Sequence, residues 1–352
     1  MVIGIDYRLA ASSCRGMGRY SREIVKKLFD IDSLNQYILY IDTDCNECLP
    51  YNFRWHKLPT ANYIVGEQIY LACAVRSDKL DVLWSTSNTF PLIIPNRVRL
   101  IVTIHDLIFM YSLPNHQNFT QRVGALYRRA VANLGIRRVD QVVTVSEFSA
   151  HEIKRILKIN NVVITYNCIE SFYAAASNKQ CAPMTDKFYF TLSADAPSKN
   201  LNFLLNVFSN RLSTQKLVVG GIKERSKLRE KYKFSNIVFL KEGIDDSELI
   251  GYYQHCEAFI YVSLFEGFGI PPLEALACGA KIICSNATSL PEVVNDNGLL
   301  IDPTNEKELI EAVKNISNFE IDNNKREKHL EKFINWQTSA FIIKSLWAKK
   351  IN

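Results

Sequence analysis

Short apolar runs alternate with stretches of helical periodicity along nearly the whole chain. The apolar runs lack a regular polar alternation, which is typical of parallel strands covered on both faces. They predict strands at Val2–Asp6, Tyr37–Ile41, Val82–Ser85, Leu100–Ile104, Gln141–Val145, Val162–Tyr166, Phe188–Leu192, Lys216–Val219, Ile237–Leu240, Ala258–Val262, Lys281–Cys284 and Gly298–Ile301. Helices are expected between them at Arg19–Phe29, Gln121–Leu134, Ser149–Leu157, Leu201–Phe208, Asp246–His255 and Glu306–Ile316. The alternation predicts a doubly wound α/β architecture.

The segment Ser171–Asp186 has no strong periodicity and separates two such series, so we expect a linker there. Residues 1–170 then form one Rossmann-like domain and residues 187–335 a second. A chain of 352 residues is long enough for two domains that each bury a core. The amphipathic tail Phe333–Lys350 predicts a last helix, with Trp336 as one of its apolar anchors.

The most informative motif is the run from Glu266 to Glu274, which places two carboxylates eight residues apart. Gly267 and Gly269 carry no side chain, so the backbone N–H groups of this turn are accessible to a ligand. The prolines that follow suit the first turn of a helix. We expect Glu266 on a loop and Glu274 in the first helical turn, beside a helix N-terminus that favours phosphate.

A second glycine loop, Gly16-Met-Gly18, opens the first long helix and is a candidate phosphate cradle. A dinucleotide-binding fingerprint is disfavoured, because Ser21 stands where the third glycine belongs and the loop starts ten residues after Asp6. A purely structural turn is the alternative.

Two side chains follow predicted strands, where ligands of open α/β sheets bind. His105 can donate a hydrogen bond to a sugar hydroxyl or a phosphate; the alternative is a histidine bonded to local backbone. Lys199 opens a helix in the second domain and is a candidate phosphate partner, against the alternative of a solvated lysine. Lys223 and Arg225 repeat this theme more weakly after the next strand.

Arginines crowd one helical region of the first domain. They suit an anionic lipid headgroup or a lipid-linked acceptor, and the alternative is a solvated basic face. They are Arg122, Arg128, Arg129, Arg137 and Arg138. Nearby, Ser149-Ala-His-Glu152 has the pattern of a structural capping box.

Composition narrows the classes of partner. The net charge of +6 fits an anionic substrate or membrane surface, and is too small to indicate nucleic acid. The nine cysteines include one pair, Cys45 and Cys48, at CxxC spacing, without the further ligands of a zinc site. Met1–Asp6 already forms a predicted core strand, so we expect no secretory signal and a cytosolic setting. No apolar run approaches the roughly 20 residues of a membrane span, so we expect only peripheral membrane contact.

Together these motifs resemble the retaining glycosyltransferases of family 4, which have the GT-B fold. Motifs in the family's order and spacing are Gly16-Met-Gly18-Arg19-Tyr20, Gly66-Glu67-Gln68, His105-Asp106, Val145-Ser146-Glu147-Phe148-Ser149, Lys199-Asn200, Glu266 to Glu274 and Ser289-Leu-Pro291-Glu292-Val293. The resemblance implies two Rossmann-like domains that face a cleft. It also implies a C-terminal helix, about residues 336–352, that returns to the first domain.

The resemblance implies a role for each motif residue. Glu274 would hold the ribose, and Glu266 the transferred sugar together with the backbone of Gly267, Phe268 and Gly269. Lys199 would neutralise the diphosphate, helped by the helix end at Ile270 and by Gly16 and Gly18, while His105 would lie near the anomeric centre. The implied acceptor-binding residues are Arg19, Asp106, Arg122 and Arg128. No metal or other cofactor is implied, because cations and helix dipoles take the charge.

One departure concerns the diphosphate. The family often has a basic residue directly before the lysine, where this chain has Ser198, and the usual Val-Gly upstream is replaced by Ser193-Ala194. The second cation is therefore absent from its expected place, and Lys223 and Arg225 are the candidates to replace it.

The expected activity is transfer of a sugar from a nucleotide donor to a lipid-linked oligosaccharide or polysaccharide. The setting implied by the resemblance is O-antigen or capsule synthesis at the cytoplasmic face of the inner membrane. GDP-mannose is the preferred donor, and UDP-N-acetylglucosamine, UDP-glucose, GDP-fucose and dTDP-rhamnose are the alternatives. The rival classes are a non-catalytic nucleotide-sugar-binding protein of the same fold and an oxidoreductase.

Overall fold

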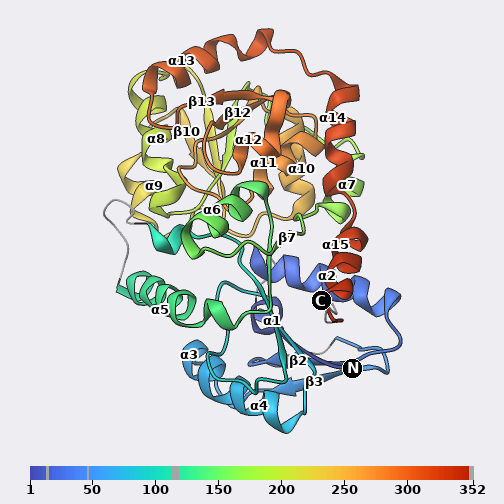
Figure 1. Cartoon of the computed structure of the whole chain (residues 1–352). Coiled ribbons are helices and arrows are strands. Elements are labelled where there is room, and N and C mark those ends of the chain that lie inside the picture. The colour runs from blue at the N-terminus through green and yellow to red at the C-terminus, as the bar shows by residue number, and fades with distance from the viewer. Residues whose placement is uncertain (13–15, 46, 112–118, 349–352) are drawn as a thin grey trace. The chain divides into compact units, whose positions relative to one another are not determined.

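A computed structural model describes residues 1–12, 16–45, 47–111 and 119–348 and divides into two compact units (Figure 1). Within the described residues, the first unit takes the chain as far as Cys168 and again from Asn335. The second unit runs from Ile169 to Ile334. Each unit contains one parallel sheet with helices packed against it, which is the architecture that the alternation of elements predicts.

The sheet of the first unit has seven parallel strands in the order β3-β2-β1-β4-β5-β6-β7. Its strands are β1 (Val2–Asp6), β2 (Gln36–Ile41), β3 (Phe53–Lys57), β4 (Val82–Ser85), β5 (Arg99–Thr103), β6 (Gln141–Thr144) and β7 (Val162–Ile164). The strand order reverses between β1 and β4, where sheets of this kind open a crevice at their carboxyl edge. Strand β3 was not expected, since its sequence Phe-Arg-Trp-His-Lys is largely polar; it lies at the sheet edge, where one face meets water.

The helices of the first unit follow the predicted positions within a few residues, with several short elements added. They are α1 (Arg8–Ser12), α2 (Met17–Ile31), α3 (Tyr63–Val65), the π-helical turn η1 (Gly66–Leu71), α4 (Ala72–Ser77), η2 (Ile108–Met110), α5 (Phe119–Gly135), η3 (Ile136–Arg138), α6 (Glu147–Leu157) and α15 (Trp336–Ser345). The predicted capping box was wrong by one turn. Ser146, not Ser149, caps α6, because its hydroxyl accepts a hydrogen bond from the Ser149 N–H.

The C-terminal helix α15 packs against α2 in the first unit, which confirms the expected return of the chain (Figure 1). The Trp336 ring meets Tyr20 edge-on at 6.0 Å between centroids. The Lys344 ammonium donates to the Ile31 carbonyl, the last residue of α2, at 2.6 Å. A cation at a helix C-terminus is favoured by the helix dipole.

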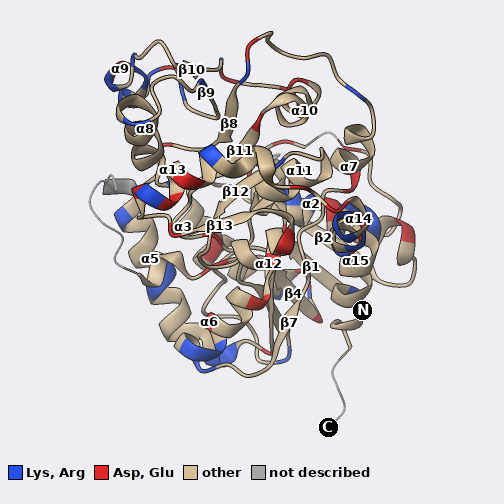
Figure 2. Cartoon of the chain, turned by 90° about the horizontal axis from the view of Figure 1, so that it is seen from above, with Lys and Arg blue, Asp and Glu red and all other residues tan. Residues whose placement is uncertain are grey.

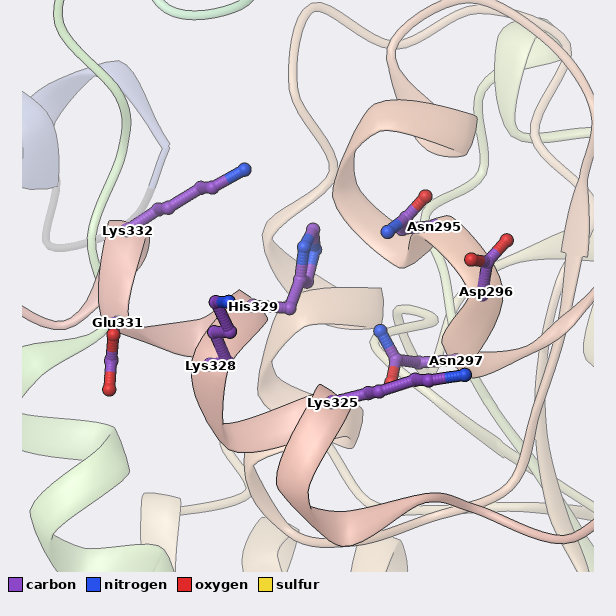
Figure 3. A pocket seen from close by; sticks show the side chains of 8 residues that line it. All are labelled: Asn295, Asp296, Asn297, Lys325, Lys328, His329, Glu331 and Lys332. Atoms are coloured by element: carbon purple, nitrogen blue, oxygen red, sulfur yellow. The ribbon is translucent and has the colours of Figure 1, made fainter.

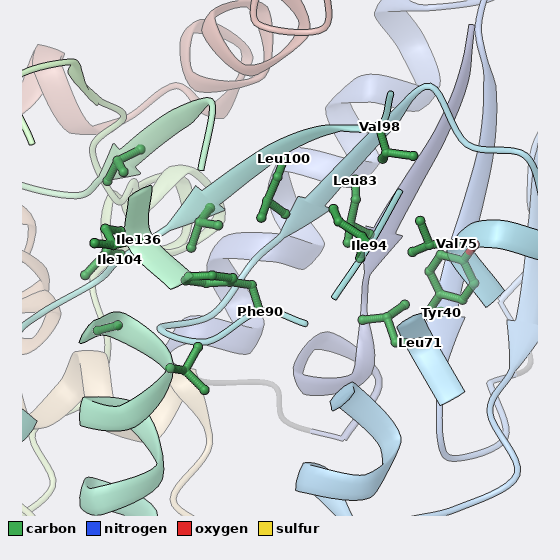
Figure 4. Close-up of a cluster of buried hydrophobic side chains, with 14 of the residues drawn as sticks. Tyr40, Leu71, Val75, Leu83, Phe90, Ile94, Val98, Leu100, Ile104 and Ile136 are labelled. Atoms are coloured by element: carbon green, nitrogen blue, oxygen red, sulfur yellow. The ribbon is translucent and has the colours of Figure 1, made fainter. Parts of the chain in front are cut away.

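The core of the first unit is apolar and continuous from the sheet into the flanking helices (Figure 4). Leu83 and Leu100 project from β4 and β5, and Leu71 and Val75 meet them from η1 and α4. Phe90 lies between these groups and Ile136. This packing fixes the carboxyl ends of β1, β4 and β5, which carry the polar side chains described below.

The second unit repeats the same topology with six parallel strands in the order β10-β9-β8-β11-β12-β13. Its strands are β8 (Tyr189–Leu192), β9 (Leu217–Gly220), β10 (Ile237–Phe239), β11 (Ala258–Tyr261), β12 (Ile282–Ser285) and β13 (Leu299–Ile301). The order reverses between β8 and β11, so the loops that follow these two strands are neighbours.

The helical elements of the second unit include a helix in the segment expected to be a linker. They are α7 (Glu170–Ala176), η4 (Pro197–Lys199), α8 (Leu201–Asn210), α9 (Lys227–Lys231), α10 (Asp246–His255), α11 (Ile270–Ala277), α12 (Leu290–Val294), η5 (Asn295–Asn297), α13 (Glu306–Asn315), η6 (Ile316–Asn318), α14 (Asn323–Leu330) and η7 (Glu331–Phe333). Helix α7 packs against α10 and α11 and buries Phe172, so residues 171–186 begin inside the second unit. In the described ranges, no helix is both long and apolar enough to span a bilayer.

Candidate functional site

Two of the predicted site residues meet where the strand order of the second unit reverses. Lys199 follows β8 and Glu266 follows β11, and these strands are hydrogen-bonded neighbours. The Lys199 Nζ atom lies 2.6 Å from Glu266 Oε1. The lysine side chain is 26% exposed and the glutamate 12%, so solvent and a ligand reach both. The topology thus joins two side chains that are 67 residues apart in the sequence.

Tyr261, the last residue of β11, completes this cluster and was not predicted from the sequence. Its hydroxyl donates to Glu266 Oε1 at 2.7 Å and accepts from Lys199 Nζ at 3.2 Å. Burial, and next the nearby Glu266 charge, raises the pKa of this phenol well above its ordinary value, so the hydroxyl keeps its proton. Tyr261 ends an apolar strand, and a tyrosine there is indistinguishable by pattern from a core aromatic residue.

The glycine turn after Glu266 is fixed by the loop that precedes α12. Gly269 has φ 113, and a Cβ atom there would lie 2.7 Å from Leu290 Cδ2, so the position requires glycine. The Ser289 hydroxyl donates to the carbonyls of Glu266 at 3.1 Å and Phe268 at 2.6 Å. The Glu266 N–H donates to Thr288 Oγ1 at 3.1 Å. These contacts explain why the Ser289 segment accompanies the Glu266–Glu274 block.

Glu274 lies deeper than expected. It is the fifth residue of α11, one turn beyond the predicted first turn, because the helix already begins at Ile270. Its side chain is buried, and the Tyr253 hydroxyl donates to Glu274 Oε2 at 3.4 Å. The two carboxylates of the block thus lie in different surroundings, one half-buried beside a cation and one buried beside a phenol.

Ser198 occupies the position expected to hold a second cation, and hydrogen bonds to its backbone hold it in place. Ser198 is buried, and its carbonyl accepts from Ser263 Oγ at 2.8 Å and from the Leu264 N–H at 2.7 Å. Lys223 and Arg225, the candidates to replace that cation, are exposed in the loop after β9. A hollow of about 510 Å³ beside the Pro197–Asn200 segment is lined by a different lysine, Lys231.

The corresponding reversal in the first unit carries the second glycine loop. Gly16 has φ 58° and precedes α2, and none of the described residues comes within 4 Å of where a Cβ atom would be. Gly18 is buried in the first turn of that helix, and Arg19 beside it is half-buried. Among the described residues, Gly16 is therefore unobstructed next to the amino end of α2, the kind of position where a phosphate binds.

His105 follows β5, and local backbone holds its ring. The Nε2–H group donates to the Thr86 carbonyl at 2.9 Å, and the His105 backbone N–H donates to Asn88 Oδ1 at 2.7 Å. Burial lowers its pKa to about 4, so the imidazole is neutral at physiological pH. The expected role as a hydrogen-bond donor is therefore corrected: with Nε2 engaged, the remaining ring nitrogen, Nδ1, is an acceptor.

A buried ionic network adjoins the first reversal and was also missed. Arg8 binds Asp6 through two hydrogen bonds, Nε to Oδ1 at 2.8 Å and Nη2 to Oδ2 at 2.7 Å. Its Nη2 also lies 3.4 Å from Oε1 of Glu67, which accepts from Thr89 Oγ1 at 2.8 Å. The Tyr127 hydroxyl on α5 donates to Glu67 as well. Burial, and next the Asp6 charge, raises the pKa of Glu67. The Gly66-Glu67-Gln68 motif marked one member, but sequence spacing gave no sign of its partners.

The arginine-rich region divides into structural and exposed groups. Arg129 donates to the carbonyls of Phe109 and Tyr111, and Arg138 to those of Pro95 and Val98.

Two of the predicted acceptor-binding residues have local contacts. Arg128 lies over the Phe109 ring at 6.0 Å, and Asp106 Oδ1 accepts from the Ile108 N–H at 3.0 Å. Arg122 and Arg137 are exposed. Figure 2 shows the basic residues distributed along α5.

Another hollow of the second unit is about 500 Å³ in volume (Figure 3). It is lined by Asn295, Asp296, Asn297, Lys325, Lys328, His329, Glu331 and Lys332. None of the predicted site residues is among them.

Among the described side chains, no group of three or more His, Cys, Asp or Glu residues is arranged to hold a metal ion. Cys45 and Cys48 are both free.

Each of the two units is matched by a family model of known proteins. The model for glycosyl transferases group 1 matches residues 174–334, and that for glycosyltransferase family 4 matches residues 45–171. O-antigen chain mannosyltransferase B of Escherichia coli is 27% identical over 82% of this chain and 83% of its own length. O-antigen chain mannosyltransferase RfbU of Salmonella typhimurium is 26% identical over 73% of this chain and 71% of its own length.

Solved structures share the arrangement of elements at low sequence identity. Sucrose-phosphate synthase from Thermosynechococcus elongatus has a TM-score of 0.70 at 16% identity and covers 99% of this chain and 98% of its own. WaaG, a glycosyltransferase involved in lipopolysaccharide biosynthesis, has a TM-score of 0.68 at 14% identity, over 97% of this chain and 99% of its own. The fold is GT-B, and the chain is a glycosyltransferase. It belongs to family 4 and is similar to the O-antigen mannosyltransferases.

Proposed function

We propose that this glycosyltransferase moves mannose from GDP-mannose to a lipid-linked glycan during O-antigen or other polysaccharide synthesis, with retention of anomeric configuration. The observation that carries the proposal is the Lys199–Glu266–Tyr261 cluster beside the Gly267–Gly269 turn. The cluster combines a cation for a phosphate and a carboxylate for sugar hydroxyls, beside the amino end of helix α11.

In this mechanism the residues of the second unit bind and orient the donor. Lys199 and the amino end of α11 at Ile270 stabilise the negative charge that develops on the leaving diphosphate. Glu266 accepts hydrogen bonds from the sugar, and Glu274 from the ribose. Because Lys199 and the amino end of α11 supply this positive charge, we propose that the reaction needs no metal ion. In the first unit the glycine loop at Gly16 and Gly18 contributes N–H donors, and neutral His105 accepts a hydrogen bond from a sugar hydroxyl.

Mannose is the proposed sugar because relatives that match most of this chain are named mannosyltransferases. The same site chemistry suits UDP-N-acetylglucosamine, UDP-glucose, GDP-fucose and dTDP-rhamnose, since all of them carry a diphosphate and sugar hydroxyls; dTDP-rhamnose differs in having a deoxyribose in place of the ribose. A panel of these donors with a lipid-linked glycan acceptor tests the choice. Turnover with another donor, and none with GDP-mannose, would replace mannose and leave the reaction class in place.

The alternative function from a different class is that of a non-catalytic protein that binds a nucleotide sugar. It predicts binding in the panel without transfer to any acceptor, whereas an enzyme transfers sugar to at least one. Metal independence is tested in the same assay. Activity that EDTA abolishes and Mg²⁺ restores would contradict it.

We also propose a cytoplasmic location with peripheral contact between α5 and an anionic membrane surface, where a lipid-linked acceptor resides. Helix α5 exposes apolar side chains between basic ones: Leu126 is 62% exposed and Leu134 75%. Arg122 and Arg137 are exposed as well. Apolar side chains flanked by arginine suit the headgroup region of a bilayer that carries negative charge.

Vesicle sedimentation tests this contact. Vesicles with phosphatidylglycerol should bind the protein, and vesicles of phosphatidylcholine alone should bind it less. Leu126→Ser together with Leu134→Ser should weaken the binding, and Leu34→Ser, at an 87% exposed leucine outside α5, is the matched control. Equal binding of the double variant and the parent would contradict the assignment of this surface.

A further inference from the structure

Two buried tyrosines of the second unit each hold one carboxylate of the Glu266–Glu274 block. Tyr261, at the end of β11, donates to Glu266 Oε1 at 2.7 Å. Tyr253, on α10, donates to Glu274 Oε2 at 3.4 Å. Burial, followed by the neighbouring carboxylate, raises the pKa of both phenols well above their ordinary value, so both remain donors over the physiological range.

The hydrogen bonds to the Glu266 carboxylate all reach one of its two oxygens. Lys199 Nζ at 2.6 Å and the Tyr261 hydroxyl at 2.7 Å both bind Oε1. Within the described part of the chain, Oε2 has no hydrogen bond. Two donors on Oε1 fix the rotation of the carboxylate, and Oε2 becomes the atom that accepts from a ligand.

The two donors on Oε1 differ in how firmly they are held. Lys199 is a flexible side chain that is 26% exposed, and a diphosphate competes with Glu266 for its charge. Tyr261 is 4% exposed, and its ring stacks on Phe259 with 5.9 Å between centroids and 21° between planes. Its hydroxyl therefore stays on Glu266 when the lysine turns toward a phosphate.

We infer that Tyr261 is a positioning residue of the transfer reaction. It keeps Glu266 oriented, with Oε2 toward the hydroxyl groups of the donor sugar, after Lys199 has moved to the diphosphate. Tyr253 holds Glu274 in the same way, but through a longer hydrogen bond and for the nucleotide part of the donor. This inference rests on the proposed function, because it requires that Glu266 contact the sugar.

The matched variants Tyr261→Phe and Tyr253→Phe test the inference, since each removes one hydroxyl from a buried ring. Calorimetric titrations use GDP and GDP-mannose, and initial rates give kcat and KM with the best acceptor. Tyr261→Phe should leave GDP affinity at the parental value, reduce the preference for GDP-mannose over GDP, and lower kcat about 10- to 100-fold, as expected for a lost hydrogen bond to a charged group. Tyr253→Phe should weaken GDP binding about two- to tenfold and change kcat less.

A double-mutant cycle with Glu266→Ala separates positioning from direct contact with the ligand. If Tyr261 acts only through Glu266, Tyr261→Phe should have no further effect on GDP-mannose affinity in the Glu266→Ala background. A full effect in that background overturns the inference, and so does a parental kcat for Tyr261→Phe when Glu266→Ala has lost transfer. Thermal unfolding and GDP binding confirm that each variant is folded.

Assays of the parent protein test the proposed function independently of the Tyr261 variants. A parent that transfers no sugar from any donor of the panel and binds GDP-mannose no better than GDP removes the proposed function, and the role of Tyr261 with it. A parent that transfers a sugar from another donor keeps the inference, and the titrations are then made with that donor and its nucleoside diphosphate.

Discussion

The two units have the same strand order at their centre, but different chemistry where that order reverses. In the first unit the reversal between β1 and β4 is filled by Arg8 with Asp6 and Glu67, whose side chains are 1%, 4% and 0% exposed. In the second unit the reversal between β8 and β11 carries Lys199 and Glu266, at 26% and 12%. Both are ion pairs at equivalent places of one topology.

Burial decides what each pair can do. A buried pair cannot exchange partners without exposing an unpaired charge to a low dielectric, so the network of Arg8 is structural. A partly solvated pair exchanges at small cost, so Lys199 can leave Glu266 for a phosphate. The same crevice of a doubly wound sheet thus holds a buried framework of charges in one unit and a partly solvated, exchangeable ion pair in the other.

The largest effect is expected from Arg8→Met. It leaves Asp6 and Glu67 buried without their cation and should destabilise the first unit by about 3–5 kcal/mol. All four tryptophans, Trp55, Trp84, Trp336 and Trp347, belong to the first unit, so urea unfolding followed by tryptophan fluorescence reports on it. A shift of less than about 1 kcal/mol would show that the buried network is dispensable.

Next, Glu266→Ala should lower the rate of transfer about 10²- to 10³-fold, with a smaller loss of nucleotide affinity. Glu274→Ala should show the reverse and mainly weaken nucleotide binding. Rates and calorimetric titration measure the two effects. Glu67→Gln is the control from the first unit, and it should change transfer only a few-fold. Parental rates for both Glu266→Ala and Glu274→Ala would remove the site assignment.

The pH dependence of the first unit should contain a contribution from His105. Its pKa is about 4 in the folded chain against 6.5 as the ordinary value, so the unfolded chain binds more protons between these limits. Stability from this group is therefore present above pH 6.5 and lost as the pH falls toward 4, by about 2 kcal/mol at pH 5. His105→Gln should remove this part of the difference in tryptophan-monitored stability between pH 7 and pH 5. An unchanged difference would contradict the buried neutral imidazole.

The smallest effect is expected from Lys199→Met on stability. Its partner Glu266 is partly solvated, and the change should lower the free energy of unfolding of the second unit by no more than about 1 kcal/mol, measured by urea unfolding followed by circular dichroism. The same variant should lose transfer and GDP affinity. A loss of stability similar to that of Arg8→Met would erase the distinction between the two reversals.

Much of the fold was predictable from local patterns. Buried strands such as Val2–Asp6 and Ala258–Tyr261 are short apolar runs, and α10 has the predicted bounds Asp246–His255. Strand β3 was missed because an edge strand keeps polar side chains. Helix α7 was missed because its apolar face is short, and packing against α10 and α11 supplies its stability.

The site was predictable only in part. Lys199, Glu266 and the glycine turn lie in loops with unusual composition, which local sequence reveals. Tyr261, Tyr253 and Arg8 are not distinguishable in this way, since a buried tyrosine or an arginine beside a strand has no local signature of its partner. Their partners come from distant segments: Arg8 and Glu67 are 59 residues apart, and Lys199 and Tyr261 are 62.

Periodicity, glycine and proline act over a few residues, so local sequence was enough to predict two α/β units, the return of the C-terminal helix and the Glu266–Glu274 block. Which charges are buried and which remain exchangeable depends on contacts between distant segments, so only the folded chain shows it. Parallel strands bring the loops at their carboxyl ends together whatever their separation in the chain, and burial then sets the cost of every charge. This arrangement places the Tyr261 hydroxyl against the Glu266 carboxylate, a contact that no pattern in the sequence predicts.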